Sequence, residues 1–140
     1  MSFVAVQFYG NSLANDSGTF ISYDVEPFLP SLFSHNTAPT AYPPIRSKPL
    51  LPLNLYFAWT NPLFDEAIQT AIRESAALIK AQAVVAAGGQ DVADAAVYGN
   101  YAIFDTPVEN IYGRHLPRLK RIREAYDPRG VMGLAGGFKF

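Results

Sequence analysis

The 140-residue sequence contains no cysteine, which excludes disulfide bonds and thiolate metal sites. Its only two histidines, His35 and His115, lie far apart with no carboxylate cluster at ligand spacing, so we expect no metal site. No apolar run reaches the ~20 residues that a membrane-spanning helix needs. The opening residues also lack the basic start of a secretory signal. These absences predict a cytoplasmic protein with no membrane partner.

Charged residues are also few, and 11 Lys and Arg against 12 Asp and Glu leave a net charge of −1. A chain so close to neutrality has no overall attraction for polyanions. Six of the 11 cations fall between Arg114 and Arg129, but no interleaved aromatic residues and no known nucleic-acid module accompany them. This run therefore indicates a solvated helix face, and we expect no nucleic-acid partner. Glycine-rich phosphate loops and a Gly-x-Ser-x-Gly elbow are absent as well.

Hydrophobic residues make up 49% of the chain and aromatic residues 14%, which is typical of a folded protein. A chain of this length supports one domain with a real core, so we expect a single domain over residues 1–140.

The residue pattern predicts an α+β fold, an antiparallel β-sheet with helices packed on one face. Seven of the 11 prolines lie between Glu26 and Pro52, which predicts an irregular wrapping segment there. The expected strands are Phe3–Tyr9, Thr19–Val25, Leu53–Trp59 and Ala96–Phe104. The expected helices are a short one near Leu29–Phe33, one from Asn61-Pro62 to a stop at Gly88-Gly89, and one over 108–126 that Pro117 kinks or divides.

The last third of the chain carries a series of short motifs in a distinctive order. They are Tyr98-Gly99-Asn100-Tyr101, Tyr112-Gly113, Arg118-Leu119 and Tyr126-Asp127-Pro128. Their order and spacing resemble the closing segment of the berberine-bridge-enzyme-like FAD-linked oxidoreductases. The resemblance implies a substrate domain, which in that family follows a flavin-binding domain with an Arg-x-Gly-Gly-His attachment motif. This sequence lacks that motif, so we expect no cofactor, with FAD present only if a separate flavin domain supplies it.

The resemblance also implies which residues form the site. It places Tyr98 in the active site, Asn100 toward the flavin, and Asn54 in the hydrogen-bonded network of the catalytic tyrosine. On a strand, Asn54 and Tyr56 would share one face, as would Tyr98 and Asn100. The alternative is that Tyr98 and Asn100 are buried polar residues with backbone partners. The expected catalytic residues are Tyr98 and Asn54, and the expected substrate-binding residues are Arg46, Tyr56, Asn100, Tyr9 and Tyr23.

Three functions compete on these grounds, and we favour the first. The first is a flavin-independent isomerase, cyclase or pericyclase that acts on a small hydrophobic secondary metabolite, because such reactions need a shaped cleft and a hydrogen-bond donor rather than a redox cofactor. The second is the substrate-binding half of a split FAD-linked oxidoreductase. The third is a non-catalytic ligand-binding domain. A face that relatives cover with a flavin domain would be apolar, which predicts a homo-oligomer such as a homodimer.

Overall fold

The structure, a computed structural model, describes residues 2–35, 37–47, 51–86 and 92–140. The chain divides into two compact units. Unit 1 comprises Met1–Phe28 and Leu51–Asp94, and unit 2 comprises Leu29–Leu50 and Ala95–Phe140. The expected single domain over residues 1–140 stays a prediction.

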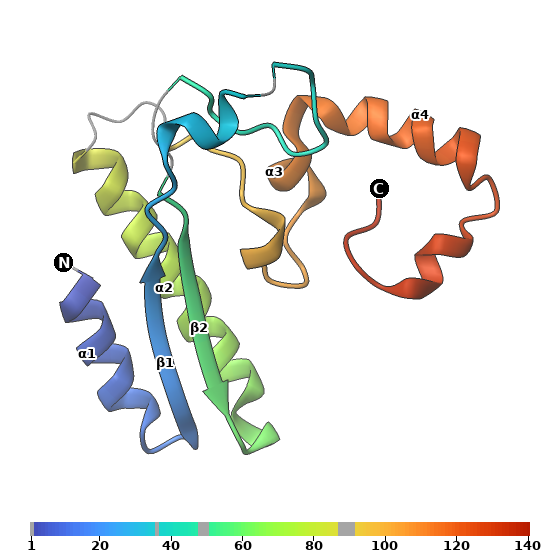
Figure 1. Cartoon of the computed structure of the whole chain (residues 1–140). Helices are drawn as coiled ribbons and strands as arrows, with labels where there is room; N and C mark the ends of the chain where they lie inside the picture. The colour runs from blue at the N-terminus through green and yellow to red at the C-terminus, as the bar shows by residue number, and fades with distance from the viewer. Residues whose placement is uncertain (1, 36, 48–50, 87–91) are drawn as a thin grey trace. The chain divides into compact units, whose positions relative to one another are not determined.

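Unit 1 is an antiparallel strand pair with two helices, as Figure 1 shows. Its elements are α1 (Ser2–Leu13), β1 (Gly18–Val25), β2 (Leu53–Trp59), a 3₁₀ turn (Pro62–Phe64) and α2 (Asp65–Ala86). In the register of the sheet, Ile21 lies opposite Phe57 and Tyr23 opposite Leu55. The predicted α+β class and the predicted strands Thr19–Val25 and Leu53–Trp59 are confirmed.

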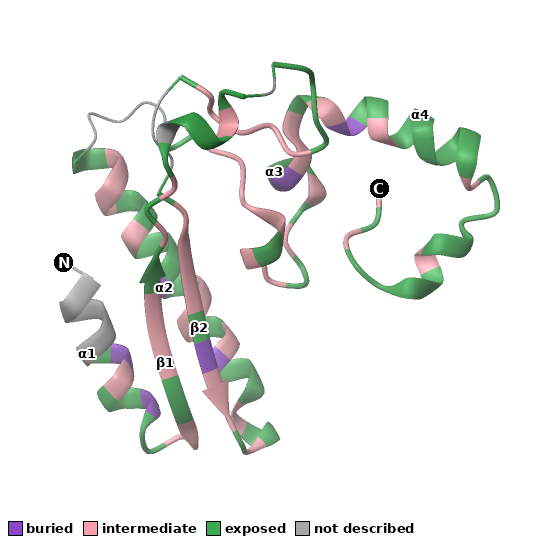
Figure 2. Cartoon of the chain, viewed as in Figure 1, coloured by how far each residue is buried: buried purple, intermediate pink, exposed green. Residues whose placement is uncertain are grey.

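Both helices of unit 1 pack against the same side of the strand pair. One buried cluster joins Tyr9 and Leu13 of α1, Phe57 of β2 and Ile68 of α2 (Figure 2). Burying a side chain of this size contributes roughly 1.5–3 kcal/mol. The alternation predicted for β2 therefore holds, because Phe57 faces this core.

A polar contact lies inside this core. The hydroxyl oxygens of Tyr23 on β1 and Ser75 on α2 are 2.6 Å apart, and Ser75 is fully buried. Burial raises the pKa of Tyr23 above its ordinary 10.0, although the hydrogen bond between Tyr23 and Ser75 opposes this effect. The pair therefore stays neutral and links the sheet to α2.

The start of α2 follows the predicted signals. Asn61 Oδ1 accepts a hydrogen bond from the Leu63 N–H at 3.1 Å, so Asn61 is the cap, although the first turn is 3₁₀ rather than α-helical. Trp59 Nε1 donates to Asp65 Oδ1 at 2.6 Å, which joins the end of β2 to the helix. The predicted stop at Gly88-Gly89 lies outside the described residues.

The prediction of a strand at Phe3–Tyr9 is wrong, because this stretch belongs to helix α1. A helix places Tyr9 and Leu13, four residues apart, on one face, where both reach the core. Helix α1 continues through Gly10, because a glycine inside a helix costs only about 1 kcal/mol. A Cβ at Gly10 would meet no atom within 4 Å, so no close contact requires a glycine there. The chain turns over residues 14–17, and β1 begins at Gly18, where a Cβ would lie 2.8 Å from the carbonyl oxygen of Leu13.

Unit 2 is built from short helices and turns. Its elements are the 3₁₀ turn Pro30–Phe33, the 3₁₀ turn Gly99–Tyr101, α3 (Val108–Tyr112), the 3₁₀ turn Gly113–His115, α4 (Leu116–Tyr126) and the 3₁₀ turn Val131–Ala135. Its most buried apolar side chains are Ile111 and Leu116. The short helix predicted near Leu29–Phe33 is present as the first of these 3₁₀ turns.

The helix predicted over 108–126 is divided, as expected, but the break lies at Gly113 rather than at Pro117. Gly113 has a φ of +48°, a backbone conformation that side chains disfavour. Pro117 lies in the first turn of α4, where its missing N–H leaves no helical hydrogen bond unmade.

The prediction of a strand at Ala96–Phe104 is also wrong. The Tyr101 N–H donates to the Tyr98 carbonyl at 2.9 Å and closes a 3₁₀ turn over Gly99–Tyr101. Val97 bonds to the carbonyl of Asn110 in α3 rather than to a strand. The aromatic residues have β propensity, but without a neighbouring strand the turn-forming Gly99-Asn100 pair determines the backbone.

None of the helices in the described part of the chain is long and apolar enough to cross a bilayer.

The contact between Tyr23 and Ser75 yields the first prediction. Tyr23→Phe should lower the free energy of unfolding by about 1–3 kcal/mol, because it leaves the buried Ser75 hydroxyl without this partner. Ser75→Ala should cost less, since Tyr23 is partly exposed and its hydroxyl can bind water. The double variant should be no worse than Tyr23→Phe alone. Urea unfolding followed by circular dichroism measures all three.

Tyr56→Phe is the matched control, because Tyr56 is 53% exposed and should change stability by less than about 0.5 kcal/mol. If Tyr23→Phe is as harmless as this control, the buried pair does not stabilise unit 1.

Candidate functional site

Four aromatic rings form a continuous row inside unit 2, called here the aromatic row. The ring centroids of Phe33 and Tyr42 are 6.3 Å apart, and those of Tyr42 and Tyr98 are 5.6 Å apart. Tyr98 and Tyr101 meet edge to face at 5.1 Å. Each such pair contributes roughly 0.5–1.5 kcal/mol beyond the burial of its area. Two ring contacts, with Tyr42 and with Tyr101, therefore hold the ring of Tyr98.

The hydroxyl of Tyr98 has a defined partner. Asn100 Nδ2 donates a hydrogen bond to Tyr98 Oη at 2.8 Å. A phenol that accepts one hydrogen bond still has its own O–H to donate. Tyr98 is half-buried and Asn100 is exposed, so the donor lies near solvent. The arrangement offers one oriented hydrogen-bond donor to a molecule at this surface.

Tyr42 supports this donor from the other side. Burial raises the pKa of Tyr42 above its ordinary 10.0, and the proximity of Tyr98 raises it further. Tyr42 therefore remains a neutral phenol at physiological pH and places no negative charge beside Tyr98. Its own hydroxyl points at the Ala96 carbonyl over a long 3.5 Å contact.

Arg46, predicted to bind substrate, is engaged with its own segment. Its guanidinium donates to the carbonyl oxygen of Phe33 and, at 3.4 Å, to that of Ala38. These bonds tie the proline-rich stretch to the backbone of Phe33, whose ring is at one end of the aromatic row. A role in substrate binding stays a prediction for Arg46.

The remaining predicted site residues belong to unit 1. Asn54 lies opposite Asp24 in the sheet, and Tyr56 is exposed and packs edge to face against Phe20 at 5.7 Å. Tyr9 is part of the core, and Tyr23 is bonded to Ser75, so both have structural contacts. The binding and catalytic roles of Asn54, Tyr56, Tyr9 and Tyr23 stay predictions. Within unit 2, the amide that contacts Tyr98 is that of Asn100.

Sequence reasoning missed Tyr42 and Tyr101, the two rings that hold Tyr98. On the expected strand, Tyr101 would lie on the face opposite that of Tyr98 and Asn100. The sequence feature that could have indicated Tyr42 was its position directly before Pro43-Pro44. An aromatic residue at the start of such a rigid turn can pack against another ring.

Comparison with known proteins agrees with the motifs of this region. Residues 97–135 match the protein family described as Berberine and berberine like. The chain is also 51% identical over 47 residues to the FAD-linked oxidoreductase OXR1 of Pyricularia oryzae. That match covers 33% of this chain and 9% of the relative. No solved structure matches the chain. The predicted resemblance is confirmed for the segment that contains Tyr98 and Asn100.

A flavin of that family would require groups that bind its pyrophosphate, and the helix starts described between residues 62 and 135 do not fit this need. Free backbone N–H groups at a helix start are the usual phosphate site. The first turn of α2 carries Asp65 and Glu66, and that of α4 contains Pro117, which has no N–H. The carboxylate of Asp127 already occupies the start of the last 3₁₀ turn. Among the described residues there is also no group of three potential metal ligands.

The aromatic row yields the second prediction. Tyr98→Phe keeps the ring contacts and returns only the exposed amide of Asn100 to water, so the free energy of unfolding should change by less than about 0.5 kcal/mol. Tyr98→Ala removes two ring pairs and should cost about 1–3 kcal/mol. Urea unfolding followed by near-ultraviolet circular dichroism distinguishes the two. If Tyr98→Phe costs as much as Tyr98→Ala, the hydroxyl belongs to a structural network and is not free to bind a ligand.

Proposed function

Because residues 97–135 match the berberine-like family, we propose that this chain provides the substrate-facing part of an FAD-linked oxidoreductase. A separate flavin-binding domain would hold the FAD and supply the hydride-accepting chemistry. Two findings about the same segment, the family match and the hydrogen bond at Tyr98, support this proposal. The segment that matches the family and contains Tyr98 also presents the hydroxyl of Tyr98 as an oriented donor.

Tyr98 would act as the group that orients the substrate. Since Asn100 donates to the oxygen of Tyr98, the phenolic hydrogen is directed to another acceptor, such as a carbonyl or hydroxyl oxygen of the substrate. A neutral donor held by packed rings requires little reorganisation when the substrate binds. The neutral phenol of Tyr42 on one side and the ring of Tyr101 on the other favour a small hydrophobic substrate.

A second candidate is a flavin-independent isomerase, cyclase or pericyclase that acts on a secondary metabolite. The specific support is the same free phenolic donor, together with helix starts that do not fit a pyrophosphate. In that reaction Tyr98 would donate a hydrogen bond, or a proton, to a substrate carbonyl, and Asn54 remains a proposed catalytic partner. A non-catalytic ligand-binding domain would use the same residues without turnover.

Self-association also remains a prediction, and the exposed aromatic pair of Phe20 and Tyr56 on the sheet of unit 1 supports it. In helix α1, Phe8 is 66% exposed and Tyr9 is buried. The side chains of residues 3–7 lie outside the described part of the chain. The cytoplasmic address likewise stays a prediction.

The oxidoreductase proposal is tested in a chimera of the OXR1 relative that carries residues 97–135 of this chain. Tyr98→Phe in the chimera should slow substrate-dependent flavin reduction about 10²- to 10³-fold, the usual cost of losing one positioned donor. Asn100→Ala should slow it less, because the phenol remains. The absorbance of the flavin in a stopped-flow instrument reports the rate.

Tyr112→Phe is the matched control, since it also removes one phenolic hydroxyl from residues 97–135, but from a ring that is not part of the aromatic row. The isolated chain, given FAD and then desalted, should hold no flavin absorbance. Equal rates for the Tyr98→Phe chimera and its control would contradict the proposal. Turnover by the isolated chain without flavin would establish the second candidate instead.

A further inference from the structure

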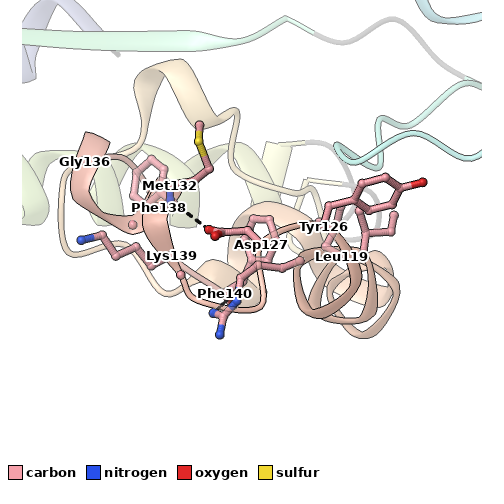
Figure 3. Close-up of a pocket in the computed structure, with 12 residues that line it drawn as sticks. Leu119, Tyr126, Asp127, Met132, Gly136, Phe138, Lys139 and Phe140 are labelled. Atoms are coloured by element: carbon pink, nitrogen blue, oxygen red, sulfur yellow. Dashed lines mark hydrogen bonds between the residues drawn. The ribbon is translucent and has the colours of Figure 1, made fainter.

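The C-terminal part of unit 2 forms an apolar cavity of about 440 Å³ that is open to solvent. It lies between α4 and the chain segment that follows it, as Figure 3 shows. The apolar side chains that line it come from both walls: Leu119, Ile122, Tyr126, Met132, Phe138 and Phe140. The volume falls within the range of about 300–1,000 Å³ that is usual for small-molecule sites.

Three contacts fix the shape of this cavity. The Asp127 carboxylate accepts hydrogen bonds from the N–H groups of Val131 and Met132 at 2.8 and 2.9 Å, which sets the turn after α4. Arg123 donates to the oxygen of Phe140 and so ties the chain end to the helix. The ring of Phe140 also packs edge to face on Tyr112 at 5.2 Å. Both walls are therefore anchored within unit 2.

The cavity is open where the chain supplies no side chain. Gly130, Gly133 and Gly136 line it, and a Cβ placed on any of them would meet no atom within 4 Å. Gly133 differs from the other two because its φ is not in the left-handed region. A larger residue at Gly133 would enter open space without backbone strain.

One cationic side chain of the cavity lining, Lys139, can meet an anion directly. The other, Arg123, donates to the carboxylate of Phe140, and both oxygens of the acidic Asp127 accept backbone hydrogen bonds. A guanidinium has five N–H donors, so Arg123 can bind an anion in addition to Phe140. Residues 114–140 carry seven cations and two acidic side chains, although the whole chain has a net charge of −1.

We propose that this cavity binds a small apolar molecule with one carboxylate group. The apolar body lies against α4 and the rings of Phe138 and Phe140, and the carboxylate lies near Arg123 and Lys139. This site is separate from the aromatic row around Tyr98 and does not depend on the oxidoreductase proposal.

Titration calorimetry of the full chain with 2-naphthoate, decanoate and neutral 2-naphthol tests the proposal. 2-Naphthoate represents an aromatic acid and decanoate an aliphatic acid. The one that binds more tightly shows which kind of apolar body the cavity prefers. At least one should bind saturably with a Kd below about 1 mM and about tenfold more tightly than 2-naphthol. No saturable binding of either acid, or equal binding of the neutral compound, would overturn the proposal.

Gly133→Leu should fill the cavity and weaken binding of the better acid more than about tenfold, with an equal or higher melting temperature. Ala135→Leu is the matched control, because Ala135 is an exposed residue of the same turn that does not line the cavity. This control should bind as the unaltered chain does. Equal affinities for the two variants would place the ligand elsewhere.

Lys139→Gln tests the charge without altering the fold, since Lys139 is exposed. It should weaken the acid about three- to tenfold and leave 2-naphthol unaffected. Lys120→Gln, on α4 but outside the cavity lining, is its control. A loss of equal size in both lysine variants would indicate only general charge attraction and would refute the proposed site.

Discussion

The candidate site depends on the ring of Tyr98 being held between the rings of Tyr42 and Tyr101. These two contacts leave the phenol little freedom to rotate, and the amide of Asn100 then fixes the orientation of its hydroxyl. An exposed tyrosine without such contacts would lose side-chain entropy each time it bound a ligand. Here the loss is already incurred on folding, which is the condition for an effective positioned donor.

Local signals were sufficient where the neighbouring residues alone determine the backbone. Asn61-Pro62 opened a helix as predicted, because the cap and the proline act within one turn. Local signals failed where tertiary contacts decide. Phe3–Tyr9 has the composition of a strand, yet it lies in helix α1, where Tyr9 and Leu13 pack into the core one helical turn apart. Propensity could not reveal this packing.

For the candidate site, too, local sequence signals predicted one part and tertiary contacts determined the rest. The family motif pointed to Tyr98 and Asn100, and both lie within the segment that matches that family. The reason given for their proximity was wrong, because a 3₁₀ turn rather than a strand brings them together. The orienting role assigned to Asn54 could not be checked from spacing, because nearness across 44 residues of sequence depends on tertiary structure. Tyr42 could not be found, because its contact with Tyr98 crosses 56 positions of sequence.

The most direct test of the account is a nuclear magnetic resonance titration of the chain labelled with ¹³C at the Cζ atom of tyrosine. The ligand is 2-acetonaphthone, an apolar ketone that can only accept a hydrogen bond, and Tyr98→Phe assigns the Tyr98 signal. The account predicts a saturable shift of this signal, and Asn100→Ala should reduce the shift. The Cζ signal of Tyr23 should not move, because the hydroxyl of Tyr23 is already bonded to Ser75. An unmoved Tyr98 signal, or a shift shared equally with Tyr23, would contradict it.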